Sequence, residues 1–223
     1  NRKAHGIDIN PLSKFIVKST IHKVSLKELD DAFTSLFSKA KKKYSYLYET
    51  KCPKCSQKGK IVNSVYDESE IVRIKGLCSS CGVYKKNADI DDKKNLKKIS
   101  KEFQILYQKG LLEFPKDKIL QYVKRSGKSQ IDELFTERAL IILSYLRKEI
   151  FLIKDKKIRD CLMLAFSSML PNISKMIPGD KDSIIGKSGW VISKLWVPKI
   201  HTEKNIFDSF ELRFKKIKKG KEE

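Results

Sequence analysis

The sequence predicts an α+β fold that is mostly α-helical and contains an inserted zinc-ribbon β-hairpin. Apolar residues recur at helical spacing over most of the chain, whereas between residues 52 and 81 the period changes to two, and two Cys-x2-Cys pairs bracket that stretch. The chain has 223 residues, of which 40% are hydrophobic and 34% charged. A sizeable core can therefore form, and collagen-like or fully disordered chains are excluded.

The charge balance points to a polyanionic partner. The chain has 48 Lys and Arg against 27 Asp and Glu, which gives a formal net charge of +21 at pH 7. A single lysine run, such as that at 41–43, is usually a solvated face. Taken together the runs exceed what solubility requires, and phosphate contacts release counterions, so nucleic acid is the expected partner.

The cysteine content and the lack of long apolar runs suggest a compartment. No run of 18 or more apolar residues occurs, and no apolar segment follows the basic residues near position 1, so neither a membrane partner nor secretion is expected. Four of the five cysteines form two close pairs, which suits metal ligation in a reducing environment. We expect a cytoplasmic protein.

The first 45 residues are expected to contain one short strand and one helix. Residues 1–24 begin with basic side chains, and their pattern predicts a strand centred on Ile7 and a turn at Asn10 and Pro11. Ser25 and Glu28 have the spacing of a capping box. Apolar residues then follow at helical spacing, so residues 25–45 predict a connecting helix.

The segment 46–90 predicts a zinc ribbon. Residues 61–66 and 71–75 alternate as two short strands, and the acidic turn 67–70 joins them into a hairpin. Each Cys-x2-Cys pair offers two thiolates from one tight turn, and the hairpin brings the two turns together around a tetrahedral Zn²⁺. The predicted zinc ligands are Cys52, Cys55, Cys78 and Cys81. Four structural thiols or two disulfides are the less favoured alternatives.

Residues 91–223 predict a mostly helical region. A helix with its stripe at 96–106 is expected to end at Gly110, and an irregular basic stretch with a short helical piece should follow at 111–130. Thr136 should cap the next helix, and a second helix should end or kink near Pro171. Residues 189–198 are expected to be extended, and a last helix has its apolar stripe at 206–217.

Two side chains in this region are expected to have structural roles. Cys161 lies on an apolar stripe, so we interpret it as a small buried hydrophobe. His201 is expected to cap or pack at the start of the last helix.

No catalytic residue is predicted. The segments 127–129 and 186–188 imitate the end of a phosphate-binding loop but lack its earlier glycine. All prolines are isolated, so no Asp-Pro-Pro-Tyr motif occurs, and the three histidines are scattered. Whether the chain belongs to an enzyme is left open by these residues.

Several segments in order resemble a known family. They are Arg2 to Leu12 with Gly6-Ile7-Asp8-Ile9-Asn10-Pro11, Tyr48 to Cys55, Leu134 to Arg138, and Trp196 to His201. The first resembles the second conserved strand of amino-group DNA methyltransferases that use S-adenosylmethionine. The whole order is similar to a bacterial and archaeal family of adenine-specific DNA methylases with a zinc-binding insertion.

The resemblance implies an internal fragment. In that family a Gly-rich cofactor loop precedes the Gly-Ile-Asp strand and an Asp-Pro-Pro-Tyr motif follows a region like this one, and both are absent here. Residues 1–24 would be a remnant of the methyltransferase sheet, and Asp8 matches the position expected to hold the ribose of S-adenosylmethionine. The segment would bind double-stranded DNA for target recognition, with adenine favoured over cytosine, would pack on the rest of the methyltransferase chain, and would not be catalytic alone.

The expected DNA contacts are the basic loop residues Lys124, Arg125 and Lys128, because loops reach grooves while the helix faces are used in packing. Two other functions remain open. One is a free-standing zinc-ribbon protein that binds nucleic acid, and the other is a structural module that docks a partner.

Overall fold

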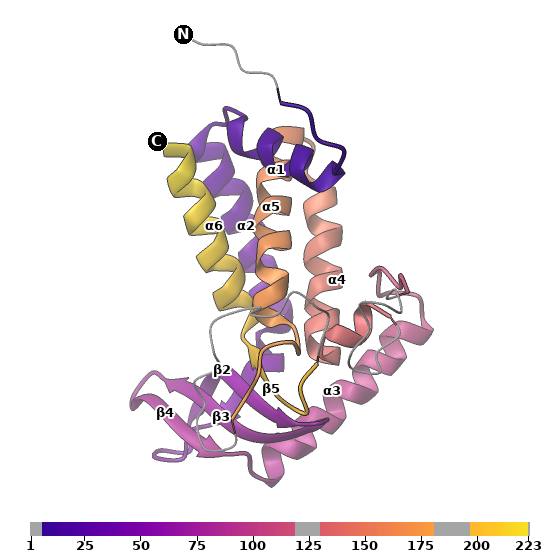
Figure 1. Ribbon diagram of the computed structural model, residues 1–223. Coiled ribbons are helices and arrows are strands. Elements are labelled where there is room, and N and C mark those ends of the chain that lie inside the picture. Colours follow the sequence, from indigo (N-terminus) through magenta and orange to yellow (C-terminus); the bar gives the residue numbers. More distant parts are fainter. Residues whose placement is uncertain (1–5, 119–129, 181–196, 223) are drawn as a thin grey trace.

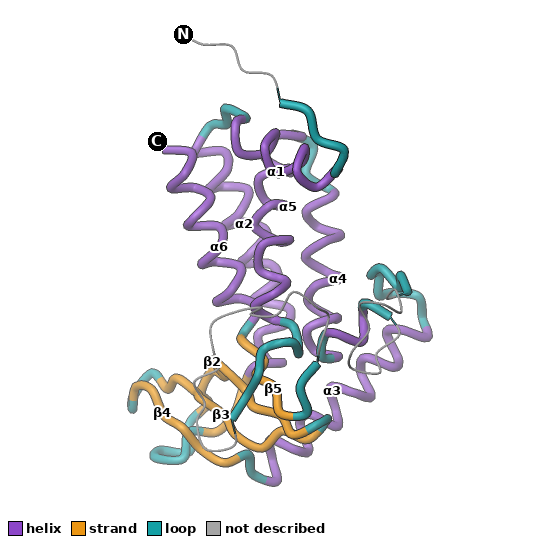
Figure 2. The backbone as a smooth tube through the Cα atoms, viewed as in Figure 1, coloured by secondary structure: helices purple, strands orange, loops and turns teal. Residues whose placement is uncertain are grey.

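The computed structural model describes residues 6–118, 130–180 and 197–222, and it has a helical bundle at one end and an antiparallel sheet at the other (Figures 1 and 2). The helices are α1 (Pro11–Ile21), α2 (Leu26–Tyr44), α3 (Ile90–Gln108), α4 (Glu137–Phe151), α5 (Lys156–Ile173) and α6 (Ile206–Glu222). The strands are β1 (Glu49–Lys51), β2 (Lys58–Asp67), β3 (Glu70–Cys78), β4 (Gly82–Asn87) and β5 (Ile200–Lys204). The predicted α+β, mostly helical class is confirmed.

The bundle forms around the apolar faces of α2, α4, α5 and α6. Ser25 caps α2 by accepting the backbone N–H of Glu28 at 3.3 Å, as its sequence predicts. Phe33 of α2 stacks on Phe214 of α6 with ring centroids 3.7 Å apart. Thr136 caps α4 through the N–H of Ala139, also as predicted. No helix in the described part of the chain is long and apolar enough to cross a membrane.

The sheet is built on the predicted hairpin. β2 and β3 pair antiparallel, β4 pairs the far edge of β3, and β1 and β5 both pair the other edge of β2. One face lies on the helices, because Ile61, Tyr66, Ile71 and Ile74 join the same core cluster as the bundle. The other face carries the alternate residues of each strand.

The structure corrects the sequence predictions at both ends of the chain. The described residues 6–10 form no strand, Ile7 is fully exposed, and the residues that follow form the unpredicted helix α1. His201 does not begin a helix: it lies in β5, and α6 starts at Ile206. Residues 111–118 form no helix, and 119–129 lie outside the described residues, as does most of the predicted extended segment 189–198.

Candidate metal centre and adjoining cavity

The first cysteine pair lies in a tight turn between β1 and β2. The backbone N–H of Cys52 donates to the carbonyl of Gln57 at 2.9 Å, and the N–H of Ser56 donates to the carbonyl of Cys52 at 2.9 Å. Ser56 has a positive φ of 59°, which lets the chain reverse directly after Cys55. Both thiols of the pair therefore face the same side of the turn.

The second pair lies in the turn between β3 and β4. Cys78 ends β3, and Gly82, with φ 73°, opens β4 directly after Cys81. That left-handed conformation favours glycine. The side chain of Ser80 donates to the Oε1 of Gln57 at 2.9 Å and so ties the second turn to the first.

The four sulfur atoms have the spacing of a metal site. All lie within 4.8 Å of one another, and the Sγ atoms of Cys55 and Cys78 are 3.6 Å apart. Zn–S bonds of about 2.3 Å in a tetrahedron place sulfurs about 3.8 Å apart. All four cysteines are free thiols, so the disulfide alternative is wrong. The cluster can bind a metal ion such as zinc.

The acidity of the thiols fits a cationic ligand. Burial raises the pKa of Cys52, but hydrogen bonds from the backbone N–H groups of Lys54 and Cys55 and with the thiols of Cys55 and Cys78 together lower it to about 7. The pKa of Cys81 is raised to about 12, first by its hydrogen bond with Cys55 and then by burial. One thiolate thus forms readily, and further thiolates beside it need a cation to balance their charge.

Tyr84 closes the cluster on the side of the sheet. Its ring is buried with Cys52 and Cys78 in one small apolar cluster. It lies so close to Gly59 and Gly76 that a Cβ at either glycine would come within 2.4 Å or 2.3 Å of the ring or its hydroxyl. Neither glycine can be replaced without displacing Tyr84.

A buried ion pair lies where the sheet meets the bundle. The carboxylate of Glu203 in β5 accepts Nε of Arg138 at 2.9 Å and its Nη2 at 2.7 Å. It also accepts the hydroxyls of Tyr48, Tyr66 and Thr136 at 2.8 to 2.9 Å. Burial raises the pKa of Glu203, but the Arg138 guanidinium and the hydrogen bonds from Tyr48 and Thr136 together lower it, and the net shift is downward. The carboxylate is therefore ionised and fully paired.

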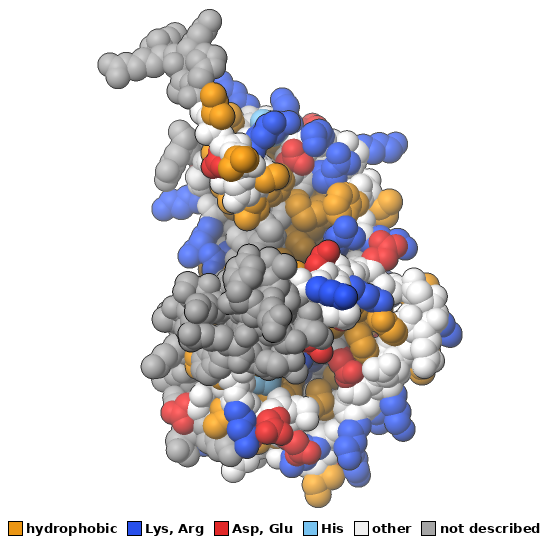
Figure 3. Space-filling view, turned by 45° about the vertical axis from the view of Figure 1, so that its right-hand side comes forward, with side chains coloured by type: hydrophobic (Ala, Val, Ile, Leu, Met, Phe, Trp, Pro, Cys, Tyr) orange, Lys and Arg blue, Asp and Glu red, His pale blue; other side chains and the backbone are white. Residues whose placement is uncertain are grey.

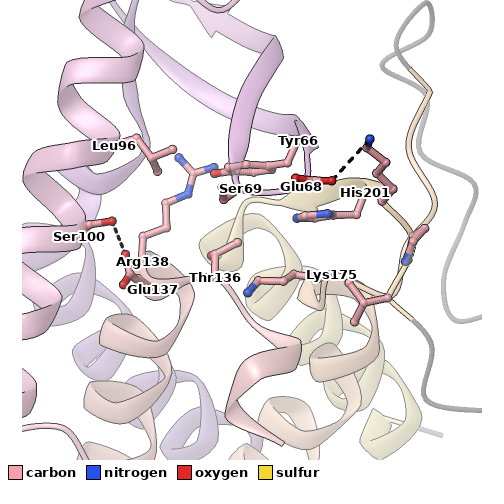
Figure 4. Close-up of a pocket in the computed structure, with 13 residues that line it drawn as sticks. Tyr66, Glu68, Ser69, Leu96, Ser100, Thr136, Glu137, Arg138, Lys175 and His201 are labelled. Carbon is pink, nitrogen blue, oxygen red and sulfur yellow. Dashed lines mark hydrogen bonds and ion pairs between the residues drawn. The ribbon is translucent and has the colours of Figure 1, made fainter. Parts of the chain in front are cut away.

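Arg138 of this ion pair also lines a cavity of about 640 Å³ (Figure 4). Thr136, Glu137 and Arg138 from the start of α4 line one side, and Lys175 and His201 line another. His201 is 3% exposed and stacks on Tyr66 with the ring planes 6° apart. Burial lowers the pKa of His201 to about 4. His201 thus packs, as predicted, but it caps no helix.

The pairing of Arg138 with Glu203 was not predicted from the sequence. One feature of the sequence could have indicated it: Arg138 directly precedes the apolar run 139–143, and an arginine buried with such a run requires an acidic partner. The partner is 65 residues away and lies in a strand that the sequence did not predict. Cys161 is buried on α5, as interpreted.

Asp8 has a local role in this structure. It is exposed, and its side chain accepts the backbone N–H of Asn10 at 2.8 Å, just before α1 begins. That hydrogen bond is the main cause that lowers the pKa of Asp8. The segment that leads into α1 lies at the end of the molecule opposite the sheet (Figure 1).

The predicted DNA contacts Lys124, Arg125 and Lys128 lie outside the described residues. Near the cysteine cluster, Lys58 pairs with Glu49 at 3.0 Å and Lys60 pairs with Asp208 at 2.7 Å. These two lysines are therefore partly neutralised, whereas Lys54 is exposed at the tip of its turn.

Comparison of the chain with protein-family models, with curated proteins and with solved structures gives no match. The function is therefore argued from the residues and their geometry.

Proposed function

We propose that this chain binds double-stranded DNA and serves as the target-recognition segment of an S-adenosylmethionine-dependent adenine DNA methyltransferase. The proposal rests on the combination of two features. A cluster of four cysteines that can bind zinc joins two turns of the sheet, and the chain has a net charge of +21. Zinc ribbons supply rigid turns without a large core. A surplus of cations supplies affinity for phosphates that is independent of sequence.

The methyltransferase part of the proposal is supported by the family resemblance and by the α1 end of the molecule. Ile7 and Ile9 are fully exposed, and α1 exposes Leu12, Val17 and Ile21 by 54% to 71%. Figure 3 shows exposed hydrophobic side chains near the top of the molecule, in the region of α1. An apolar segment followed by an amphipathic helix suits packing on the sheet of a larger methyltransferase.

DNA binding is tested by titrating a labelled duplex with the zinc-loaded chain at several salt concentrations. We expect a dissociation constant in the range of about 10⁻⁴ to 10⁻⁶ M near physiological salt, and a steep loss of affinity as salt rises. A flat titration even at low salt would contradict DNA binding and favour a partner-docking module.

The parent activity is tested separately. We expect the coding sequence around this segment to specify a Gly-rich cofactor loop before it and an Asp-Pro-Pro-Tyr motif after it. We also expect that the chain by itself transfers no methyl group from S-adenosylmethionine to DNA. If DNA binding holds but neither motif flanks the segment, the alternative of a free-standing zinc-ribbon nucleic-acid binder is favoured.

A further inference from the structure

The outer face of the sheet, which points away from the α3 and α4 side, has a row of cationic side chains. The register pairs Lys204 of β5 with Asn63 of β2, Asn63 with Lys75 of β3, and Lys75 with Lys85 of β4. Residues paired in this way lie side by side on one face. The row therefore crosses four strands, and three of its four members are lysines.

The assignment of this row to the outer face follows from the residues on either side of it in β2. Ser64 and Tyr66 point toward the bundle, where they contact Arg138 and Glu203. Asn63 and Val65 alternate with them and point the other way. Arg73 pairs with Val65 and so lies on this outer face, in the row next to Lys75.

Within the part of the chain that the structure describes, the lysines of this row have no carboxylate partner. No Asp or Glu occupies a position in the row, and among the described residues none of the three lysines forms an ion pair with a carboxylate. By contrast, Lys86 points to the opposite face, where it pairs with Asp89 and Asp92 at 2.7 and 2.8 Å. Lys86 on the core side is therefore neutralised, whereas the lysines of the outer row pair with no carboxylate of the described residues.

Lys204 also has a cationic neighbour on α6. It is half-buried, and both burial and the nearby guanidinium of Arg213 lower its pKa. A second cation beside a partly desolvated ammonium is unfavourable in the isolated chain. A bound anion would remove that repulsion.

We propose that the row formed by Lys204, Lys75 and Lys85 is the surface that contacts the phosphate backbone of nucleic acid. This inference rests on the proposed DNA binding and names its surface. It places phosphate contacts on the sheet beside the cysteine cluster, in addition to the contacts expected from the basic loop.

The width of the row determines the mode of contact. Four strands spaced by about 4.8 Å span about 14 Å. The major groove of B-DNA is about 12 Å wide and admits a helix or a two-stranded ribbon. A face this wide lies across the backbone, so its lysines contact phosphates and not base edges, and the sequence of the duplex should change the affinity little.

The test compares two triple variants of the zinc-loaded chain that lose the same charge. The first is Lys75→Gln, Lys85→Gln and Lys204→Gln, and the control is Lys39→Gln, Lys42→Gln and Lys148→Gln, which are exposed lysines of α2 and α4. Both are titrated with one duplex over a range of salt concentrations. Circular dichroism and thermal melting report whether each variant is folded.

We expect the sheet variant to lower the slope of log affinity against log salt by about 2.7, since each phosphate contact contributes about 0.9. Its affinity at 0.1 M salt should fall about 100-fold or more, whereas the control should change by about threefold or less. If the triple variant does not fold, Lys85→Gln alone, an exposed residue on the edge strand, should lower the slope by about 0.9.

Three outcomes would overturn the assignment. The two triple variants could weaken binding equally, which would mean that only net charge matters. The sheet variants could bind as the unsubstituted chain does. Finally, the unsubstituted chain could bind polyglutamate as tightly as duplex at the same salt, which would indicate an acidic protein partner. Failure of the unsubstituted chain to bind duplex would instead contradict the proposed function itself.

Discussion

The pair of Arg138 and Glu203 shows how one residue depends on another that is distant in sequence. Both side chains are buried, with 2% and 0% of their surface exposed. Removal of one partner leaves the other charge buried without compensation, which typically costs about 3 to 5 kcal/mol, whereas removal of both charges costs less. The pair therefore specifies how the sheet docks on α4 more than it adds net stability.

We predict that Arg138→Met lowers the free energy of unfolding by about 3 to 5 kcal/mol at pH 7. Arg138→Met with Glu203→Gln should cost less than the sum of the single changes, because these sites are coupled. In the unsubstituted chain the lowered pKa of Glu203 gives stability that is present above its unfolded pKa and lost as pH falls. Urea unfolding of the four proteins measures the cycle.

A matched surface pair provides the control for this cycle. Lys215 and Glu211 are 2.7 Å apart on α6, with Lys215 68% exposed, so Lys215→Met should change stability by less than about 1 kcal/mol. Strict additivity of Arg138→Met and Glu203→Gln would show that the buried contact is not formed.

The buried ring of His201 predicts a second dependence of stability on pH, in a higher pH range than that of Glu203. Its pKa is lowered from 6.5 to about 4 by burial, followed by Lys175. The unfolded chain therefore binds the proton more readily, and the stability contributed by the neutral ring is present above pH 6.5 and lost as pH falls toward 4. We expect a loss of about 3 kcal/mol across this window, seen by urea unfolding. His201→Phe keeps a ring beside Tyr66 and should flatten the profile; parallel profiles would rule out a buried neutral histidine.

Structural features that depend on residues close in sequence were predicted well, whereas contacts between residues distant in sequence were not. The caps at Ser25 and Thr136, the hairpin of β2 and β3, and the clustering of the four cysteines depend on residues close in sequence, and their sequence patterns predicted each of them. β5 has only five residues, and its position depends on pairing with β2, more than 130 residues earlier. Such pairing leaves no local pattern, which is why His201 was expected at a helix start.

The N-terminal prediction failed for a different reason. Ile7 and Ile9 alternate with polar neighbours, as a strand requires, but a strand needs a paired neighbour for its hydrogen bonds. None of the described strands pairs with this segment. Helix α1 was missed although Asn10 caps it by accepting the N–H of Leu12 and Pro11 begins it, a combination typical of helix starts.

The packing of β4 against the cysteine turns gives a prediction at the same scale. Gly76→Ala should destabilise the chain by about 1 to 3 kcal/mol, because its Cβ overlaps the Tyr84 ring and this site is closely packed. Tyr84→Ala in the same protein should make Gly76→Ala nearly neutral. Gly6→Ala, which meets no atom within 4 Å, serves as the control. Thermal melting of the zinc-loaded variants measures the effect, and an equal cost of Gly76→Ala with and without Tyr84 would contradict the steric explanation.

On the scale of the whole molecule, stability has two separate sources. The large core joins all the bundle helices to the inner side of the sheet through residues such as Tyr66 and Ile74. The cysteine turns and Tyr84 form a distinct small cluster that has too few apolar residues to fold by burial alone. Small units of this kind depend on metal binding, because the binding free energy becomes folding free energy.

We therefore predict that metal removal unfolds one end of the molecule and leaves the other intact. After chelation, amides in 52–59 and 77–84 should exchange rapidly with solvent, while those of α2, α4 and α5 stay protected, because their core cluster contains none of the four cysteines. The helical signal in far-ultraviolet circular dichroism should change little.

Elemental analysis of the untreated chain should give about one zinc per molecule, and Cys161→Ser, outside the cluster, should retain it. A cooperative loss of all helix on chelation would contradict this prediction. It would show that unfolding of the cysteine turns spreads into the bundle through the ion pair of Arg138 and Glu203, so that the metal stabilises the whole fold.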